Sequence, residues 1–491
     1  MMNSDRVSAI PRCLVISALL VLAVFGGISR AAETDTQGID AVILLDCSGS
    51  MKKTDPMMYR KPAARMFISL LGEDDRAAVV GFSDTAEVFS GLTPAADEAG
   101  RQRLVKALER IQSTGAHTNL YEALSKGYDL LKPSPKKKKM IILMSDGRMD
   151  VGDRARDSAL ISAMKTTLIS EARGAGIKIY TMAFSDEADR DLLRDVARLG
   201  GGLFISGRSD RNLHLDFASI FERAKSPDSL PIENDSFIVD DSVREMTLLL
   251  TKKTAGTSIS VFDPSGRAQT ARNHDPRVQW FDSPVFEMVT LMNPERGKWS
   301  LKYNAGEGNK VYIVANLRLA SSFDRFFVPE GENIKIEAWL EREKDQLNVR
   351  EILDQVGMTA TIVMPGGRRV EVKLADGGTG GDDAPGDGIY AGLFRPPAEG
   401  DYRLLIRAGA KTFTREKEYR FSVFEPAVAS PSDSAVSGSA STATTVEEQE
   451  ESVNWGMVIM KFVAINLFCA LLYYGGGKGL SYLRIKTRGK S

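Results

Sequence analysis

Oxygen-bearing side chains follow the first strongly apolar segment of the chain. Residues 39–46, IDAVILLD, end in Asp46, and Ser48 and Ser50 follow it at alternate positions. Alternate residues of an extended segment point to the same side, so the carboxylate and the two hydroxyls can converge on one point. The competing interpretation is an Asx turn or a helix N-cap, because Asp and Ser favour both.

Two further positions carry the same chemistry at a similar place in the pattern. Thr118 lies in a loop before a helix-like segment, and Asp146 ends the apolar run 140–146, MIILMSD. Together the candidate ligands are two carboxylates and three hydroxyls: Asp46, Ser48, Ser50, Thr118 and Asp146. Hard oxygen ligands with so few charges suit octahedral Mg²⁺ at about 2.1 Å, with Mn²⁺ or Ca²⁺ as alternatives. Such a set leaves the ion short of one ligand, which an Asp or Glu of a protein partner can supply.

Two neighbouring residues have side chains that also bind metals. Cys47 alternates away from the two serines, which favours a small buried side chain over a ligand. His117 stands beside Thr118. It is either a ligand or, as we favour, a loop residue at the rim of the site.

The elements that would position these ligands are strands alternating with helices between residues 39 and 225. Strand-like segments at 39–46, 76–83, 140–146, 177–184 and 203–206 are separated by helix-like ones, among them a long helix expected at 157–173. This alternation predicts a doubly wound α/β domain, with a mostly parallel sheet covered on both faces. Ligands bind such sheets beyond the carboxyl ends of the strands, where Asp46 and Asp146 fall.

The motifs also resemble a known family. The D-x-S-x-S stretch 46–50, Thr118 and the SDG that contains Asp146 are similar to the metal-ion-dependent adhesion site (MIDAS) of von Willebrand factor type A (VWA) domains, and the resemblance covers 39–225. It implies that the first four ligands hold the ion directly or through water. It implies that Asp146 often acts through water and joins the ion directly as the conformation changes, with a sixth position left for an acidic partner. We therefore expect a binding protein and not an enzyme.

Beyond the predicted VWA domain the pattern changes to short strands separated by Gly, Pro and Asn. It predicts two β-sandwich domains, at 232–322 and 327–425, the second Ig-like. Phrases such as VFDPSG and NPERGKWSL are similar to the β-modules of calcium-activated chloride channel regulators and of bacterial surface proteins. Those regulators also carry a zinc protease domain. With three His and no His-Glu-x-x-His motif, this sequence indicates no such activity.

An Asp- and Gly-rich loop lies inside the second predicted sandwich. Its four acids are Asp376, Asp382, Asp383 and Asp387. Carboxylates on a glycine-rich loop can bind Ca²⁺, so the segment 376–388 is a second candidate metal site. A polar hairpin turn is the interpretation that we favour, because no known calcium-loop spacing is present.

Both ends of the chain predict an exported membrane protein. Residues 1–31 read as a signal peptide, with an uncleaved anchor as the alternative. The apolar run 455–474 would form a transmembrane helix about 30 Å long. A Ser/Thr/Ala-rich stalk (426–452) precedes it and a basic tail (475–491) follows, so the positive-inside rule predicts a type I protein with a cytoplasmic C-terminus. We expect the protein to be bacterial.

Other functions receive less support. A net charge of −1 argues against nucleic acid as a partner, and the only glycine-rich lysine stretch, GGGKG, lacks phosphate-loop spacing and so argues against a nucleotide. A hydrolase lacks a nucleophile–histidine pair. The main rival is an assembly factor that works with a MoxR-type AAA+ ATPase, which would usually place the VWA domain in the cytoplasm.

Overall fold

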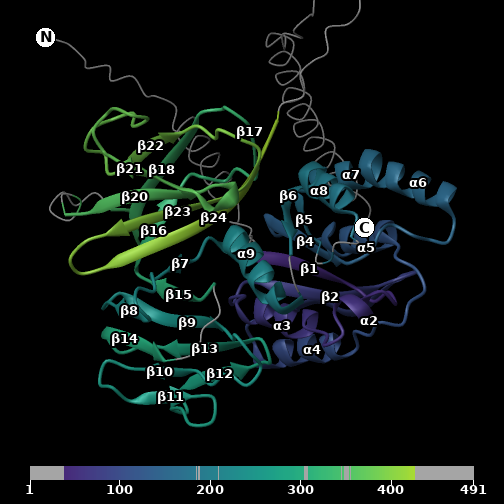
Figure 1. The fold of residues 1–491 in the computed structure, drawn as a ribbon, viewed down its shortest axis with the longest axis horizontal. Helices are drawn as coiled ribbons and strands as arrows, with labels where there is room; N and C mark the ends of the chain where they lie inside the picture. Colours follow the sequence, from purple (N-terminus) through teal and green to yellow (C-terminus); the bar gives the residue numbers. More distant parts are fainter. Residues whose placement is uncertain are drawn as a thin grey trace, which may run out of the picture. The chain divides into compact units, whose positions relative to one another are not determined.

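The N-terminal part of the structure is an α/β sheet. The computed structural model describes residues 38–425 except 184, 186–187, 208–209, 303–307, 344, 348–352 and 354. Within this part of the chain, six strands pair in the order β3-β2-β1-β4-β5-β6 (Figure 1). Their bounds are β1 Ile39–Asp46, β2 Arg76–Phe82, β3 Ala86–Pro94, β4 Lys138–Ser145, β5 Ile177–Ala183 and β6 Gly201–Ser206. Only the edge strand β3 is antiparallel to its neighbour, which confirms the mostly parallel sheet.

Helices cover both faces of this sheet (Figure 1). They are α2 Met51–Thr54, α3 Arg60–Ser69, α4 Glu98–Glu109, α5 Leu120–Leu131, α6 Arg154–Ala163, α7 Ile169–Gly174, α8 Arg190–Leu199 and α9 Leu213–Lys225. All eight residues of β1 are buried, and alternate ones serve different cores. Ile43 packs in the core that contains α3, α4 and α9, whereas Leu44 packs in the core that contains α5, α7 and α8. An apolar strand of this kind is stable because both of its faces are covered.

The long helix expected at 157–173 is interrupted. Between α6 and α7 the structure has a π-helical segment, Met164–Leu168. Within it the Thr166 hydroxyl donates to the carbonyl of Ser162 at 2.9 Å. Wider turns of this kind are locally uncommon and are not visible in apolar spacing, so the sequence pattern predicted one regular helix.

Two β-rich regions follow the α/β sheet. The strands of the first are β7 Asp228–Ser229, β8 Ser236–Val239, β9 Val243–Thr251, β10 Ser260–Phe262, β11 Ala268–Thr270, β12 Val278–Asp282, β13 Phe286–Met292, β14 Gly297–Lys302 and β15 Lys310–Ala315. Those of the second are β16 Leu317–Ser321, β17 Phe327–Pro329, β18 Ile334–Arg342, β19 Asp345–Gln346, β20 Gly357–Val363, β21 Arg369–Leu374, β22 Tyr390–Phe394, β23 Gly400–Gly409 and β24 Thr414–Phe424. Each region encloses its own apolar core between two sheets.

The two β-regions are more closely joined than two separate sandwiches would be. The short strand β7 pairs with β15 of the first region and with β24 of the second, so one ten-stranded sheet runs through both in the described residues. Strand β16, which the sequence prediction placed in the first sandwich (232–322), pairs with β18 of the second region. Apolar alternation predicts that a strand exists, but not which strand it pairs with.

Helix α9 contacts both β-regions. The Tyr312 hydroxyl donates to Glu222 at 2.9 Å, and Arg223 donates to the carbonyl of Asp324 at 2.8 Å. Near the start of the helix, His214 Nε2 lies 2.9 Å from the Thr251 hydroxyl. All described residues belong to one compact unit, and these contacts help to join its parts.

Several sequence predictions concern residues outside the described part of the chain. They are the signal peptide 1–31, the stalk 426–452, the transmembrane helix 455–474 and the basic tail 475–491. Among the residues that are described, none of the helices is both long and apolar enough to cross a membrane.

Candidate functional site

The first acid of the predicted MIDAS is buried at the end of β1. Asp46 is 0% exposed. One of its carboxylate oxygens accepts a hydrogen bond from the Ser48 amide at 2.8 Å, and the other accepts one from the Ser145 hydroxyl of β4 at 2.7 Å. Because β1 and β4 are parallel neighbours, their carboxyl ends lie at the same edge of the sheet. The sheet therefore fixes the orientation of this carboxylate from two sides.

The two serines and the second acid form a chain of hydrogen bonds. Ser48 Oγ lies 2.9 Å from Ser50 Oγ. Ser50 Oγ in turn donates to Asp146 Oδ1 at 2.9 Å, across 96 positions of sequence. The other oxygen of Asp146, Oδ2, accepts a hydrogen bond from the Thr54 hydroxyl of α2. Both oxygens of Asp146 are thus bonded to hydroxyls of the segment that follows β1.

Thr118 is held beside the segment that carries Asp146. Its backbone pairs with Asp150 in both directions, with N···O distances of 2.9 and 3.0 Å. A Cβ placed on Gly147 would lie 3.1 Å from the Thr118 hydroxyl, so that hydroxyl lies against the backbone just after Asp146.

A second backbone link ties the Thr118 loop to the loop after β1. Gly115 donates to the carbonyl of Cys47 at 2.9 Å, and Gly49 donates to the carbonyl of Gly115 at 2.8 Å. All three predicted segments are therefore connected by hydrogen bonds at one edge of the sheet.

Burial dominates the electrostatics of the two acids. It raises the pKa of Asp46 to about 6, although hydrogen bonds from Ser48 and Ser145 oppose the shift. Burial also raises the pKa of Asp146, against the opposing hydrogen bonds from Thr54 and Ser50. Two desolvated carboxylates close enough to repel one another are costly unless a cation lies near them. The oxygen-only donor set and this electrostatic need both fit a divalent cation.

A buried ion pair supports the segment between the serines and α3. Arg60 Nη1 lies 2.6 Å from Asp55 Oδ2, and both side chains are 0% exposed. Arg60 Nη2 also donates to the Ser113 hydroxyl at 2.7 Å. This pair anchors the turn that carries Thr54 between the site and the core.

Cys47 and His117 are not part of the hydroxyl chain. Cys47 Sγ donates to the carbonyl of Leu45 at 3.5 Å, and burial raises the pKa of its thiol. His117 lies between two acids, 3.9 Å from an Asp84 oxygen and 3.6 Å from an Asp150 oxygen. These positions agree with the interpretation of His117 as a rim residue.

Sequence reasoning missed two residues of this cluster, Thr54 and Ser145. Ser145 immediately precedes Asp146, and Thr54 follows Ser50 by four positions, which is one helical turn. These positions alone do not predict a role in the site, because Ser and Thr are common near helix starts and strand ends for other reasons.

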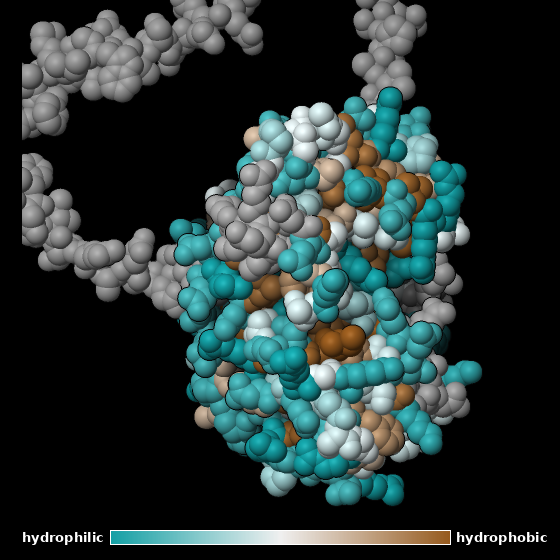
Figure 2. Space-filling model, turned by 90° about the vertical axis from the view of Figure 1, so that its left-hand side faces the viewer, coloured by the Kyte–Doolittle hydropathy of each residue, from teal (hydrophilic) through white to brown (hydrophobic). Residues whose placement is uncertain are grey.

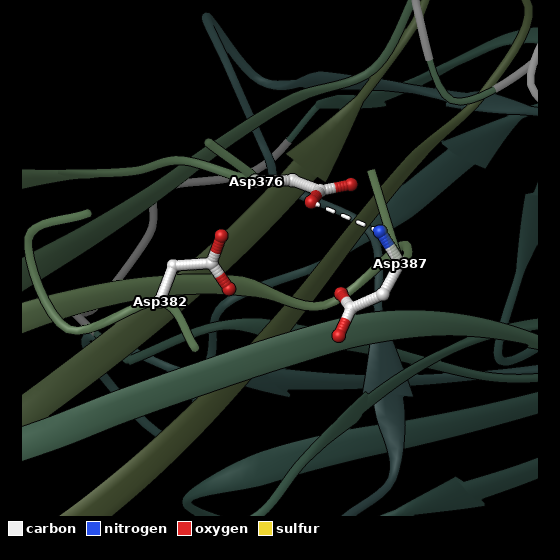
Figure 3. Close-up of side chains that lie close together, drawn as sticks. All are labelled: Asp376, Asp382 and Asp387. Atoms are coloured by element: carbon white, nitrogen blue, oxygen red, sulfur yellow. Dashed lines mark hydrogen bonds between the residues drawn. The ribbon is translucent and has the colours of Figure 1, made fainter. Parts of the chain in front are cut away.

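The Asp-rich loop brings three of its four acids together. One carboxylate oxygen each from Asp376, Asp382 and Asp387 lies within 4.8 Å of the others. Figure 3 shows these three side chains close together. Asp376 also accepts hydrogen bonds from the amides of Gly386 and Gly388, at 2.5 and 2.9 Å.

The fourth acid of the loop, Asp383, does not belong to this group. Asp383 is 86% exposed and pairs with Lys335 at 2.8 Å. Its neighbour Asp382 is buried and accepts from the amide of Gly378. These adjacent side chains have different partners, so the four acids do not share one site.

A wide groove in the described residues is separate from both acid clusters. It encloses about 1030 Å³ between α3, α4 and α9 on one side and β9, β12, β13 and β15 on the other, and none of the five predicted MIDAS residues lines it. The molecular face in Figure 2 is mainly hydrophilic, with hydrophobic residues in separate patches.

Three parts of the chain match known protein families. The von Willebrand factor type A domain family matches residues 41–148. Residues 220–316 match the hemicentin galactose-binding domain-like family, and residues 317–416 match the second Ig-like domain of conditioned medium factor.

Curated relatives are similar to most of this chain. Calcium-activated chloride channel regulator 2 of Mus musculus is 25% identical over 408 residues, which cover 74% of this chain and 40% of that protein. Regulator 1 of Macaca mulatta is 24% identical over 392 residues, with the same coverage of 74% and 40%. The chain thus spans about 40% of the length of these relatives.

Solved structures show weaker similarity. A von Willebrand factor type A protein from Catenulispora acidiphila has a TM-score of 0.33 at 17% identity and covers 63% of this chain and 64% of its own. The PilB minor pilin of Streptococcus sanguinis has a TM-score of 0.32 at 17% identity and covers 39% and 62%. Scores this low support no functional argument. From the family matches, the chain contains a von Willebrand factor type A domain followed by β-rich domains, and 74% of its length is similar to calcium-activated chloride channel regulators.

Proposed function

We propose that the VWA domain binds a protein partner through a Mg²⁺ ion. Its ligands are the predicted set: Asp46, Ser48, Ser50, Thr118 and Asp146. The partner contributes an exposed Asp or Glu. The role is adhesion or scaffolding, without catalysis.

The observation that supports this proposal is the convergence of three distant segments. Ser50 Oγ lies 2.9 Å from Asp146 Oδ1, and the Thr118 hydroxyl lies against Gly147. A helix cap or an Asx turn would need only local contacts between Asp46 and the serines. Contacts across 96 positions of sequence are better explained by a shared ligand.

The chemistry follows from the charges of the donors. Mg²⁺ would act as a Lewis acid that binds a carboxylate oxygen of the partner. With Asp146 acting through water, Asp46 is the one charged direct ligand of the ion, and the three hydroxyls carry no charge. A carboxylate is therefore a better last ligand than a neutral group. The edge of the sheet orients these donors before the partner arrives, which lowers the entropy cost of binding.

The test measures how much partner protein the purified full-length chain binds in Mg²⁺ and in EDTA. We expect capture in Mg²⁺, loss in EDTA, and loss with Asp46→Asn, which removes the charge but keeps the shape of the side chain. The matched control is Asp84→Asn, because Asp84 is an exposed acid near the rim. Equal capture by wild type in Mg²⁺ and EDTA rules out the mechanism.

The proposed location is the outer side of a membrane. The chain would be a single-span type I protein, with the VWA domain in the periplasm or outside the cell. The support is the pattern of the predicted signal 1–31 and span 455–474. A reporter fused after Ser491 is expected to be cytoplasmic and one fused near Gly38 exported. A cytoplasmic signal from residues 39–225 would instead favour the assembly-factor function with a MoxR-type ATPase.

We also propose a structural Ca²⁺ site in the loop 376–388. Its support is the approach of the carboxylates of Asp376, Asp382 and Asp387 within 4.8 Å. Ca²⁺ accepts carboxylate and backbone oxygens in flexible geometry, as a glycine-rich loop can offer. Its role would be to stabilise the hairpin and not to bind the partner.

A further inference from the structure

Thr54 occupies a position that the MIDAS pattern does not include. Helix α2 begins directly after Ser50, so one helical turn brings Thr54 back beside that serine. The Thr54 hydroxyl lies 3.4 Å from the carbonyl of Ser50 and donates to Asp146 Oδ2. Ser50 occupies the other oxygen, Oδ1, at 2.9 Å. The carboxylate of Asp146 is therefore held by two hydroxyls of one short segment.

Asp146 has no easy alternative partner for the oxygen that Thr54 holds. The residue is 1% exposed, so water does not reach it freely. Its own backbone carbonyl is fixed by the Ser185 hydroxyl at 2.8 Å. A buried carboxylate oxygen without a donor is costly. If the Thr54 hydroxyl is removed, a cation in the site becomes the nearest group that can satisfy Oδ2.

We propose that Thr54 is a positioning residue that restrains Asp146 from binding the metal directly, and so keeps one coordination position open for the carboxylate of the partner. This inference rests on the function proposed above and concerns the regulation of the same site. Thr54 does not touch the metal. It acts through Asp146.

Charge explains why this restraint matters. With Asp46 and three hydroxyls as direct ligands, a divalent ion keeps a net charge near +1 and attracts an acidic partner. When Asp146 binds directly, the net charge falls to about zero and the attraction weakens. Restraint by Thr54 should therefore weaken binding of the ion alone and strengthen binding of the acidic partner.

The test compares Thr54→Val, which removes the hydroxyl and keeps the shape, with Thr54→Ser, which keeps the hydroxyl. Mg²⁺ binding to the full-length chain is measured by calorimetry. Mn²⁺ binding is followed by water proton relaxation, which reports the water molecules left on the ion. For T54V we expect about tenfold tighter metal binding, the equivalent of one hydrogen bond to a charged group, and about one fewer bound water. T54S should match the wild type in both measurements.

Three outcomes overturn the inference. They are unchanged metal affinity and relaxation in T54V, weaker metal binding in T54V, or a T54S variant that behaves like T54V. Circular dichroism of each variant checks folding, and T54S provides the hydroxyl-dependent comparison if T54V folds poorly. A wild type that binds neither Mg²⁺ nor Mn²⁺ would instead refute the proposed function itself.

Discussion

The two acid clusters of this chain are built in opposite ways. The cluster at the edge of the parallel sheet collects side chains from three segments, and Asp46 and Asp146 are 0% and 1% exposed. The cluster in the second β-region comes from a single loop, in which the exposed Asp387 and the half-buried Asp376 flank the buried Asp382. The first therefore depends on the tertiary fold, whereas the second depends mainly on the local conformation of its loop.

The hydrogen-bond donors differ in the same way. Hydroxyls donate to both acids of the first cluster, as Ser145 does to Asp46 at 2.7 Å, and one backbone amide, that of Ser48, adds to them. Backbone amides hold the acids of the second, as Gly388 holds Asp376 at 2.9 Å. Hydroxyls can bind a metal as well as donate, but amides can only donate. The first cluster thus suits an ion that exchanges ligands with a partner, and the second suits an ion that only stabilises a loop.

The first prediction tests whether the two clusters are independent. Asp46→Asn should weaken Mg²⁺ binding more than 100-fold, about 2.7 kcal/mol, because it removes the buried charge that balances the ion. Asp376→Asn should leave that Mg²⁺ affinity within about twofold. Calorimetric titration of both variants of the full-length chain measures this. If D46N keeps the Mg²⁺ affinity of the wild type, the first cluster is not the Mg²⁺ site and the contrast between the two clusters is wrong.

Another buried acid, Asp216, shows what burial does without hydroxyl donors. Asp216 of α9 is buried, and its Oδ2 has no hydrogen-bond partner among the described residues. Burial raises its pKa to about 7, partly opposed by the charge of Arg420. The folded state therefore keeps the proton while the unfolded chain loses it, and stability falls as pH rises from about 4 to about 7.

Asp216→Asn should remove this loss. We expect the variant to be more stable than wild type by about 2–4 kcal/mol at pH 8 and equally stable near pH 4. Urea denaturation at the two pH values, without metal, measures the difference. A constant difference at both pH values would show that the amide changes packing and not proton binding.

The Asp-rich loop should respond to Ca²⁺. At 100 times the dissociation constant, a bound ion stabilises the folded state by about 2.7 kcal/mol. Thermal unfolding with and without Ca²⁺ should show this gain in wild type and its loss in Asp382→Asn. Asp383→Asn is the matched control, because Asp383 pairs with Lys335 and should keep the gain. Equal losses in both variants would favour a diffuse charge effect over a site.

The smallest expected effect concerns His214, two residues before Asp216. Burial lowers its pKa to about 3, and its ring is stacked on Phe286 at 4.9 Å. The unfolded chain binds a proton below pH 6.5 and the folded state does not, so stability falls as pH decreases. Between pH 7 and pH 5, this proton binding should lower the free energy of unfolding of the wild type by about 2 kcal/mol. His214→Gln should remove that decrease. If urea denaturation shows the same fall in the free energy of unfolding from pH 7 to pH 5 in both proteins, this assignment is wrong.

Much of the fold followed from local pattern. The strand that ends at Asp46 and the strand–helix alternation were predicted because a buried parallel strand needs apolar residues on both faces. The interruption of the helix at Met164–Leu168 and the pairing of β16 with β18 were not. Local spacing carries no information about helix turn type or about the partner of a strand.

The candidate site was likewise predictable in part. The sequence by itself determined its chemistry, because the oxygen ligands and their places at strand ends are visible as residue types and spacing. Only the tertiary structure decided that Thr54 bonds to Asp146 and that Asp383 turns to Lys335. The physical reason is that residue type sets what a side chain can bind, whereas its direction depends on packing against residues far away in the sequence.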